Sequence, residues 1–191
     1  MKLLVDRLTS VPSKHCFEGS QTWWAGHASE TGEIAEPLGP IQFEIMANTI
    51  GENVYLEGSS EVDLEVECSR CVARYRHALR ETFRLVLEPV GEREPPDPEG
   101  AEALKRDGLC LSDDLELGWY RGAEIDMEPF LAEVVALAMP VQPLCRDDCA
   151  GLCPECGANR NEAACGCSEL KPNSPFAVLA SLRAEQSGGK P

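Results

Sequence analysis

Alternation of apolar and polar residues marks the first half of the chain as β-structure. Ile41–Ile45 alternates with period two, and the short run Val54–Leu56 does the same. Successive side chains of a strand point to opposite faces, so this pattern indicates strands with one buried face and one wet face. Antiparallel sheets commonly have one wet face, and the pattern therefore predicts antiparallel strands here.

The clearest alternation predicts a long hairpin with strands over 61–68 and about 72–88. The apolar positions of the first strand are Val62, Leu64, Val66 and Cys68, with acids between them. The outward positions of the second strand are Arg74, Arg76, Arg80 and Arg84. With a turn at 69–70, position 65 would lie opposite 74 and position 63 opposite 76. This register predicts the cross-strand ion pairs Glu65–Arg74 and Asp63–Arg76.

Residues 91–108 interrupt the pattern. The stretch Pro95–Gly100 is rich in proline and acids, which predicts an acidic loop without regular structure. A linker between two domains is the alternative. A short strand near Leu115–Trp119 follows, and then a helix over 126–139, with Asp126 as its N-cap and Pro140 at its end.

A cysteine-rich segment and a last short helix close the chain. Ser174 is the predicted cap of that helix, with Pro175 at its first position. The predicted organisation is an antiparallel β domain over 1–144, which includes the loop 91–108 and the helix 126–139. Residues 145–185 would form a small cysteine-rich module with the terminal helix.

Charge limits the kinds of partner that the chain can bind. The 191 residues carry 17 basic and 33 acidic side chains, a net charge of −16. This excludes a protein that binds nucleic acid through its bulk charge, because phosphates attract cations.

The longest apolar run, Val134–Val141, is far shorter than the roughly twenty residues of a membrane span. A charged pair near the start also interrupts any signal-peptide core, so we expect a cytoplasmic protein.

Six of the ten cysteines are crowded into a short segment, which points to metal. They are Cys145, Cys149, Cys153, Cys156, Cys165 and Cys167. The strongest part is Cys153–Gly157, because two thiolates separated by two residues can bind one ion from a tight turn. Zinc prefers four such ligands, and the second pair would be Cys145 with Cys149 or Cys165 with Cys167. The six thiolates could also serve one ion with two spectators, or more than one metal. An all-thiolate zinc site is structural; the alternatives are an iron–sulfur cluster and free structural or redox cysteines.

The pair Cys68 and Cys71 lies at the predicted hairpin turn, with no second pair nearby in the sequence. Three interpretations stay open: structural turn cysteines, metal ligands with a remote or intermolecular partner, and a redox pair. A thioredoxin-like site needs a strand-to-helix context, whereas strands flank this motif on both sides. The isolated Cys16 and Cys110 receive no role.

A row of arginines on the second strand also has two interpretations. It could be an RNA-phosphate stripe, or a solvated face whose charges are neutralised across the hairpin. The residues least obviously compensated, and hence the candidate RNA contacts, are Arg70, Arg80 and Arg84. The sequence contains no phosphate-binding loop, dinucleotide motif or nucleophile elbow.

Several motifs resemble those of one family. Leu64–Cys71 is similar to the LECxRC segment of the YceD family, the large ribosomal RNA subunit accumulation proteins. Glu124–Asp126 and Leu137–Cys145 resemble its EIDL and LALPxxPLC segments. Cys149–Gly157 matches the cysteine-bearing members, and Lys171–Leu182 resembles the closing PNPFAVLASL. The motifs follow the family order.

The resemblance implies an α+β fold with an antiparallel, barrel-like sheet, a packing helix and a small zinc-ribbon-like module. It implies a non-enzymatic role in the synthesis, processing or stability of large-subunit (23S) rRNA. The expected partners are the large-subunit rRNA precursor, a basic ribosomal protein, or both, with structural Zn²⁺ as cofactor and no membrane or small-molecule substrate. Two other classes remain: a CxxC redox or metal-responsive protein, and a zinc-ribbon adaptor in transcription.

Overall fold

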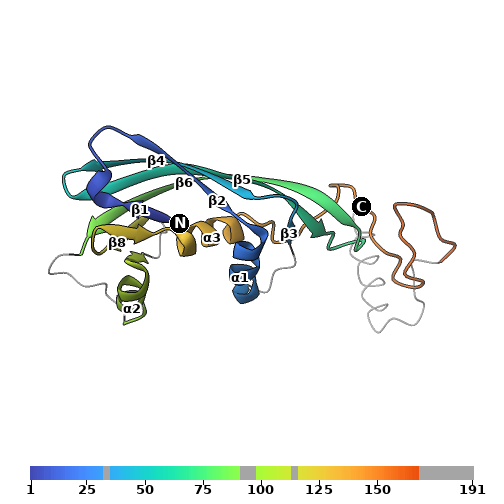
Figure 1. Ribbon diagram of the computed structural model, residues 1–191. Coiled ribbons are helices and arrows are strands. Elements are labelled where there is room, and N and C mark those ends of the chain that lie inside the picture. Colours follow the sequence, from blue (N-terminus) through green and yellow to red (C-terminus); the bar gives the residue numbers. More distant parts are fainter. Residues whose placement is uncertain (32–34, 91–97, 113–115, 168–191) are drawn as a thin grey trace, which may run out of the picture.

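The computed structural model describes residues 1–31, 35–90, 98–112 and 116–167. The predicted helix that begins near Ser174 lies outside these residues. Within them the protein is an α+β fold made mostly of sheet (Figure 1). The strands are β1 (Lys2–Leu4), β2 (Ser13–Gly19), β3 (Glu36–Pro37), β4 (Ile41–Ile50), β5 (Asn53–Glu67), β6 (Arg74–Pro89), β7 (Leu109–Leu111), β8 (Leu117–Tyr120) and β9 (Glu124–Asp126). The helices are α1 (Gln21–Thr31), α2 (Pro98–Asp107), α3 (Glu128–Leu137) and a 3₁₀ turn, Val5–Arg7.

The main sheet has the strand order β2-β4-β5-β6-β8-β7, and β3 pairs with β5. Its pairs are antiparallel except β6–β8, which run parallel. Strands β1 and β9 form a separate two-stranded sheet. The antiparallel character predicted for the first half is confirmed.

The expected barrel is wrong, because the described sheet stays open. Its first and last strands, β2 and β7, do not pair with each other. The buried face is covered by other elements, so the sheet does not need to close on itself. Helices α1 and α3 and the β1–β9 pair lie on this one side (Figure 1).

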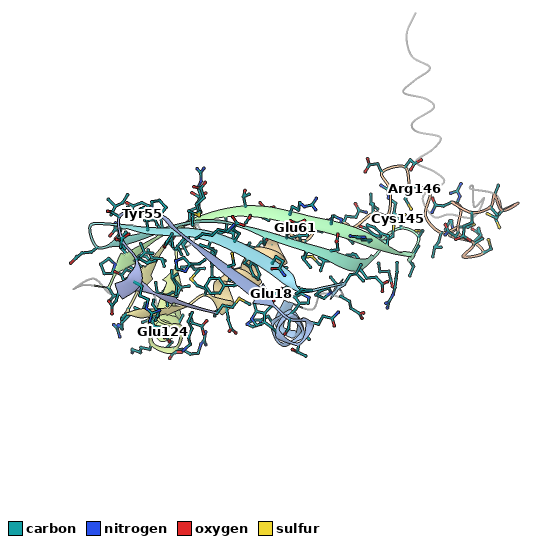
Figure 2. The ribbon with its side chains drawn as sticks, turned by 45° about the horizontal axis from the view of Figure 1, so that its top comes forward. Glu18, Tyr55, Glu61, Glu124, Cys145 and Arg146 are labelled. Atoms are coloured by element: carbon teal, nitrogen blue, oxygen red, sulfur yellow. The ribbon has the colours of Figure 1, made fainter. Side chains whose placement is uncertain are left out.

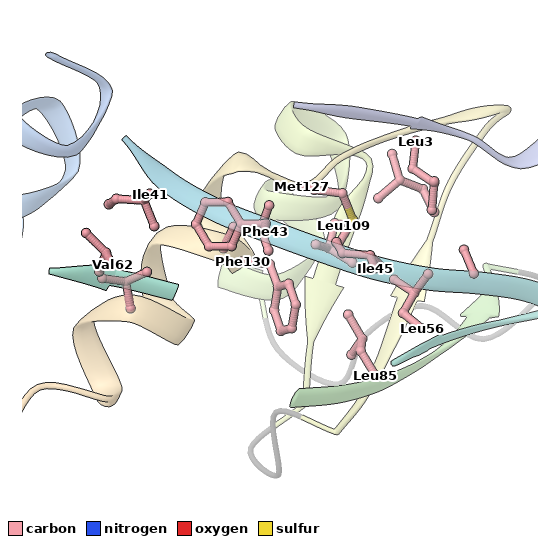
Figure 3. Close-up of a cluster of buried hydrophobic side chains, with 14 of the residues drawn as sticks. Leu3, Ile41, Phe43, Ile45, Leu56, Val62, Leu85, Leu109, Met127 and Phe130 are labelled. Atoms are coloured by element: carbon pink, nitrogen blue, oxygen red, sulfur yellow. The ribbon is translucent and has the colours of Figure 1, made fainter. Parts of the chain in front are cut away.

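The core lies between β4, β5 and β6 and the elements that cover them. Phe43 and Ile45 of β4 are almost fully buried, as are Leu131 of α3 and Ile125 of β9. Figure 3 shows side chains of these strands and of α3 meeting in one cluster. The alternation predicted for the hairpin is confirmed, since Val62, Leu64, Val66 and Cys68 are all buried.

The hairpin register differs from the predicted one by two residues. Glu65 lies opposite Arg76, and Glu67 opposite Arg74. The predicted ion pairs are nevertheless present, because each arginine reaches diagonally: Arg74 contacts Glu65 at 2.8 Å, and Arg76 contacts Asp63. The turn between β5 and β6 is longer than predicted, because it also holds the pair Cys68 and Cys71.

Part of the predicted loop 91–108 is wrong, because residues 98–107 form helix α2. Pro98 occupies its first position, where a missing N–H costs nothing, and good helix formers follow. Leu104 provides the buried apolar anchor, with 1% of its surface exposed.

The predicted helix 126–139 is shorter in the structure, where α3 begins at Glu128 and ends at Leu137. Asp126 instead ends β9, where it pairs with Lys2, although its carboxylate still accepts the N–H of Glu128 at 3.0 Å.

Helix α1 was not predicted. It places Trp24 in the core, where the indole N–H donates to the carbonyl of Ala35 at 3.0 Å.

No helix in the described part of the chain has the length and apolar character needed to cross a bilayer.

Candidate metal centres

The turn of the β5–β6 hairpin extends beyond the helices and meets the segment that follows α3 (Figure 1). Cys68, Cys71 and Cys149 form a small buried cluster there, separate from the main core, with Leu144 and Cys145 against it. The backbone joins the two segments, because the N–H of Ser69 donates to the carbonyl of Pro143 at 2.9 Å. Figure 2 places Cys145 at this end of the molecule.

Four sulfurs of this cluster, the hairpin site, can hold one metal ion. The Sγ atoms of Cys68, Cys71, Cys145 and Cys149 all lie within 4.8 Å of one another. The Cys68–Cys149 distance is 3.8 Å and the Cys71–Cys145 distance is 3.7 Å. Both distances are too long for a disulfide, which needs about 2.05 Å. A tetrahedral ion bound at about 2.3 Å requires neighbouring sulfurs about 3.8 Å apart, and the hairpin site meets this requirement.

Polar contacts hold the ligand-bearing segments of the hairpin site together. The guanidinium of Arg70 donates to the carbonyl of Cys149 at 3.2 Å, and the carbonyl of Arg70 accepts the N–H of Leu152 at 3.0 Å. The side-chain amide of Asn161 donates to the Cys149 sulfur at 3.4 Å. Donors to a ligating sulfur orient it and stabilise its thiolate form. No spacing rule in the sequence marks Asn161 for this role.

A second group of four sulfurs, the distal site, lies in the segment that follows. The Sγ atoms of Cys153, Cys156, Cys165 and Cys167 also lie within 4.8 Å of one another. Cys153 is buried, whereas Cys156 and Cys167 are exposed. The distal site is therefore more open to solvent than the hairpin site.

The two sites share one local backbone geometry. In Cys153–Gly157 the N–H of Gly157 donates to the carbonyl of Cys153 at 2.9 Å, and Gly157 has a φ of 72°. In Cys68–Val72 the N–H of Val72 donates to the carbonyl of Cys68 at 2.9 Å, and Val72 has a φ of 59°. A β-branched residue in this left-handed region is strained. The repeated turn supports the same use for both cysteine pairs, and strain of this kind is found at functional sites.

We expect Val72→Gly to raise the free energy of unfolding by about 1 kcal/mol. Glycine relieves the left-handed strain, and its greater freedom in the unfolded chain offsets part of the gain. The measurement is denaturant unfolding of the metal-saturated protein. The reciprocal change, Gly157→Val, should destabilise the protein; a less stable Val72→Gly variant would contradict the explanation.

The ionisation of the four thiols also suits a cation. Burial opposes the thiolate of Cys68, but hydrogen bonds from the backbone of Cys145 and Cys71 outweigh it and lower the pKa of Cys68 to about 6. Burial and the neighbouring Cys71 thiol raise the pKa of Cys145 to about 12. Four close sulfurs cannot all ionise without a positive charge between them, and a divalent cation supplies that charge.

The distal site repeats this behaviour. Hydrogen bonds from the backbone of Cys156 and Glu155 lower the pKa of Cys153 to about 6. The neighbouring Cys156 thiol, followed by burial, raises the pKa of Cys167 to about 12. Each group therefore has the donor chemistry of a closed four-thiolate metal site.

The structure separates the six clustered cysteines that the sequence grouped together. Of the two pairs considered for Cys153 and Cys156, it brings Cys165 and Cys167 to them. Cys145 and Cys149 instead lie next to Cys68 and Cys71. Metal ligation by Cys68 and Cys71 with a remote partner was one of the three interpretations that the sequence left open. Among the described residues neither group includes Cys16, which is exposed on β2, or Cys110, which is buried on β7.

The arginines of β6 form a neutral ladder on the outer face of the hairpin. Arg80 contacts Glu61 at 2.5 Å and Arg84 contacts Glu57 at 3.1 Å, in addition to the pairs of Arg74 and Arg76. The expectation that Arg80 and Arg84 are less compensated than Arg74 and Arg76 is therefore wrong. Each lies directly opposite its glutamate in the observed register. Arg70 lies apart, against the hairpin site.

Comparison with known proteins gives a family and several distant relatives. The family described as "Large ribosomal RNA subunit accumulation protein YceD" matches residues 56–183. An uncharacterised protein of Mycobacterium tuberculosis is 29% identical over 121 residues, 61% of this chain and 50% of its own. The large ribosomal RNA subunit accumulation protein YCED homolog 1, chloroplastic, of Arabidopsis thaliana is 24% identical over 156 residues, 75% of this chain and 49% of its own. The chain thus spans about half the length of these curated relatives. No solved structure matches it.

Proposed function

We propose that this chain, which belongs to the YceD family of large ribosomal RNA subunit accumulation proteins, supports accumulation of large-subunit (23S) rRNA in the cytoplasm without catalysing a reaction. The observation that carries the proposal is the extent of the family match. Residues 56–183 include nearly all of the β5–β6 hairpin, helix α3 and every cysteine of the two metal centres.

We assign one structural Zn²⁺ to each centre, with Cys68, Cys71, Cys145 and Cys149 in the hairpin site. Cys153, Cys156, Cys165 and Cys167 are assigned to the distal site. A zinc ion with four thiolates has no open position for a substrate, which agrees with a non-enzymatic role. The burial of Cys68, 1% exposed, also favours a structural role over a redox pair, because thiol exchange requires access.

The electrostatics favour a basic protein as the direct partner, with the rRNA precursor in the same assembly. The arginine ladder is internally neutralised, so it offers little attraction to phosphates. The net charge of −16 suits a basic ribosomal protein.

Depletion of the protein tests the proposed function. We expect the ratio of mature large-subunit to small-subunit rRNA to fall, and the protein to co-sediment with large-subunit precursors in a sucrose gradient at moderate salt. Restoration by the wild-type gene, and by a Cys16→Ser variant, controls for indirect effects. An unchanged rRNA ratio after verified depletion would refute the proposal.

A paired substitution tests whether the ladder contacts RNA. Arg80→Gln with Arg84→Gln should leave the salt dependence of binding to a large-subunit rRNA fragment unchanged, because these arginines already bind Glu61 and Glu57 and make no phosphate contact. The measurement is the slope of log K against log salt. If both residues contact phosphates, the slope should become shallower by roughly two.

A further inference from the structure

A groove runs between helix α3 and strand β6, away from both metal centres. Its volume is about 620 Å³. Its lining residues come from β5, β6, the residue before β8, α3 and the residue after α3. They include Glu81, Phe83, Glu116, Glu133, Val134 and Leu137.

The floor of this groove, the α3–β6 groove, is apolar. Phe83 packs edge-on against Phe130 of α3, with ring centroids 5.2 Å apart. Val134 continues the surface along the helix, and Leu137 ends it with 64% of its surface exposed. A leucine this exposed beside aromatic side chains is a suitable contact for another apolar side chain.

The rim of the α3–β6 groove is acidic. Four glutamates and one arginine line it, and Arg84 is already bound to Glu57. No ion pair of Glu81, Glu116 or Glu133 occurs within the described part of the chain. Three carboxylates around an apolar floor attract a partner that carries both positive charge and apolar surface.

One wall of the groove is a strand edge. Strand β8 pairs with β6 only from Val86 to Pro89. Next to Glu81–Arg84, no described strand pairs with this edge of β6. The partner can therefore approach the strand and the helix together.

We propose that the α3–β6 groove binds a short basic segment of a partner protein that carries bulky apolar side chains. The apolar side chains lie on Phe83, Val134 and Leu137, and lysine or arginine side chains pair with Glu81, Glu116 and Glu133. This inference goes beyond the proposed function, because it names a binding surface and the chemistry of its occupant. It is measured on the purified protein, so its failure is distinct from an unchanged rRNA ratio.

Fluorescence anisotropy on the full metal-loaded chain tests the proposal. The probe is a labelled 16-residue peptide of lysine and alanine with two leucines four residues apart, at 150 mM salt. The same peptide with serines for leucines, and a 16-nucleotide oligouridine, are the comparison probes. We expect the leucine peptide to bind most tightly, and Leu137→Ser to weaken it about tenfold.

A charge-matched pair of variants separates the groove from bulk charge. Glu81→Gln, Glu116→Gln and Glu133→Gln together should weaken peptide binding at least tenfold. Glu52→Gln, Glu88→Gln and Glu102→Gln remove the same charge from exposed positions outside the groove, and should change affinity less than twofold. Equal losses in both variants, no binding of the leucine peptide, or equal binding of the serine peptide would overturn the proposal.

A photo-crosslinking amino acid at position 137 identifies the occupant. A cross-link to the leucine peptide supports the proposal. A cross-link to residues 168–191 of the same chain, to a second copy, or to the oligouridine in preference to the peptide would overturn it.

Discussion

Cys68→Ser is expected to reduce the bound zinc from two ions per chain to one. Serine removes one thiolate from the hairpin site and leaves the four sulfurs of the distal site untouched. Zinc binding to small modules contributes about 10–16 kcal/mol of apparent free energy, so loss of one ion should disorder the segment that it holds. Atomic-emission analysis of the purified protein gives the stoichiometry.

Two matched variants make this result specific. Cys16→Ser replaces an exposed cysteine outside both groups and should retain two ions. Cys167→Ser should remove the ion of the distal site instead, so the double variant with Cys68→Ser should bind none. A Cys68→Ser protein with two tightly bound ions would contradict the assignment of this residue. Iron in the wild-type protein would instead indicate a cluster.

Removal of both metal ions by a strong chelator is expected to disorder 143–167 and the hairpin turn around Cys68–Val72, while the sheet stays folded. The hairpin site is a separate buried cluster, and few other apolar side chains support it. The main core includes Phe43, Leu85 and Leu131 and does not depend on the metal.

Amide hydrogen exchange measures this difference directly. Exchange in 143–167 and at the turn should accelerate after chelation, while protection in β4 and the first half of β5 persists. Addition of zinc should restore the slow exchange. Full protection in 143–167 after verified metal removal would show that these segments fold without the ion, and global loss of protection would show that the core needs it.

The sequence predicted elements whose pattern is local. Alternation located the hairpin because Val62, Leu64 and Val66 are buried and the acids between them face water. Helix α2 was missed because prolines dominated the interpretation of 91–108, whereas the buried Leu104 anchors the helix. The register was missed by two residues because the turn also holds Cys68 and Cys71, which no local pattern shows. Ion pairs predicted from the wrong register, such as Arg74–Glu65, are still present because the arginines reach diagonally.

In the candidate metal centres, too, only the local features could be predicted from the sequence. Cys153 and Cys156 could be assigned from their spacing, because two ligands on one tight turn are a local feature. The cysteine pair that completes the site of Cys68 and Cys71 could not be assigned from the sequence. Cys71 and Cys145 are 74 residues apart, and ligand-spacing rules do not extend that far. Only the fold, which places the hairpin turn against the segment after α3, brings these four sulfurs together.

The unequal separations of the cysteine pairs make the two metal sites depend differently on the rest of the fold. In the distal site the two pairs are separated by the nine residues from Cys156 to Cys165, whereas the hairpin site must close the 74 residues from Cys71 to Cys145. Closing the longer loop costs about 2 kcal/mol more in chain entropy, unless the sheet has already folded and brought the ends together. The distal site can therefore form within its own short segment, whereas the hairpin site forms at low entropic cost only after the sheet and α3 have brought its two cysteine pairs together. A metal ion in the hairpin site thus reports that the domain has folded.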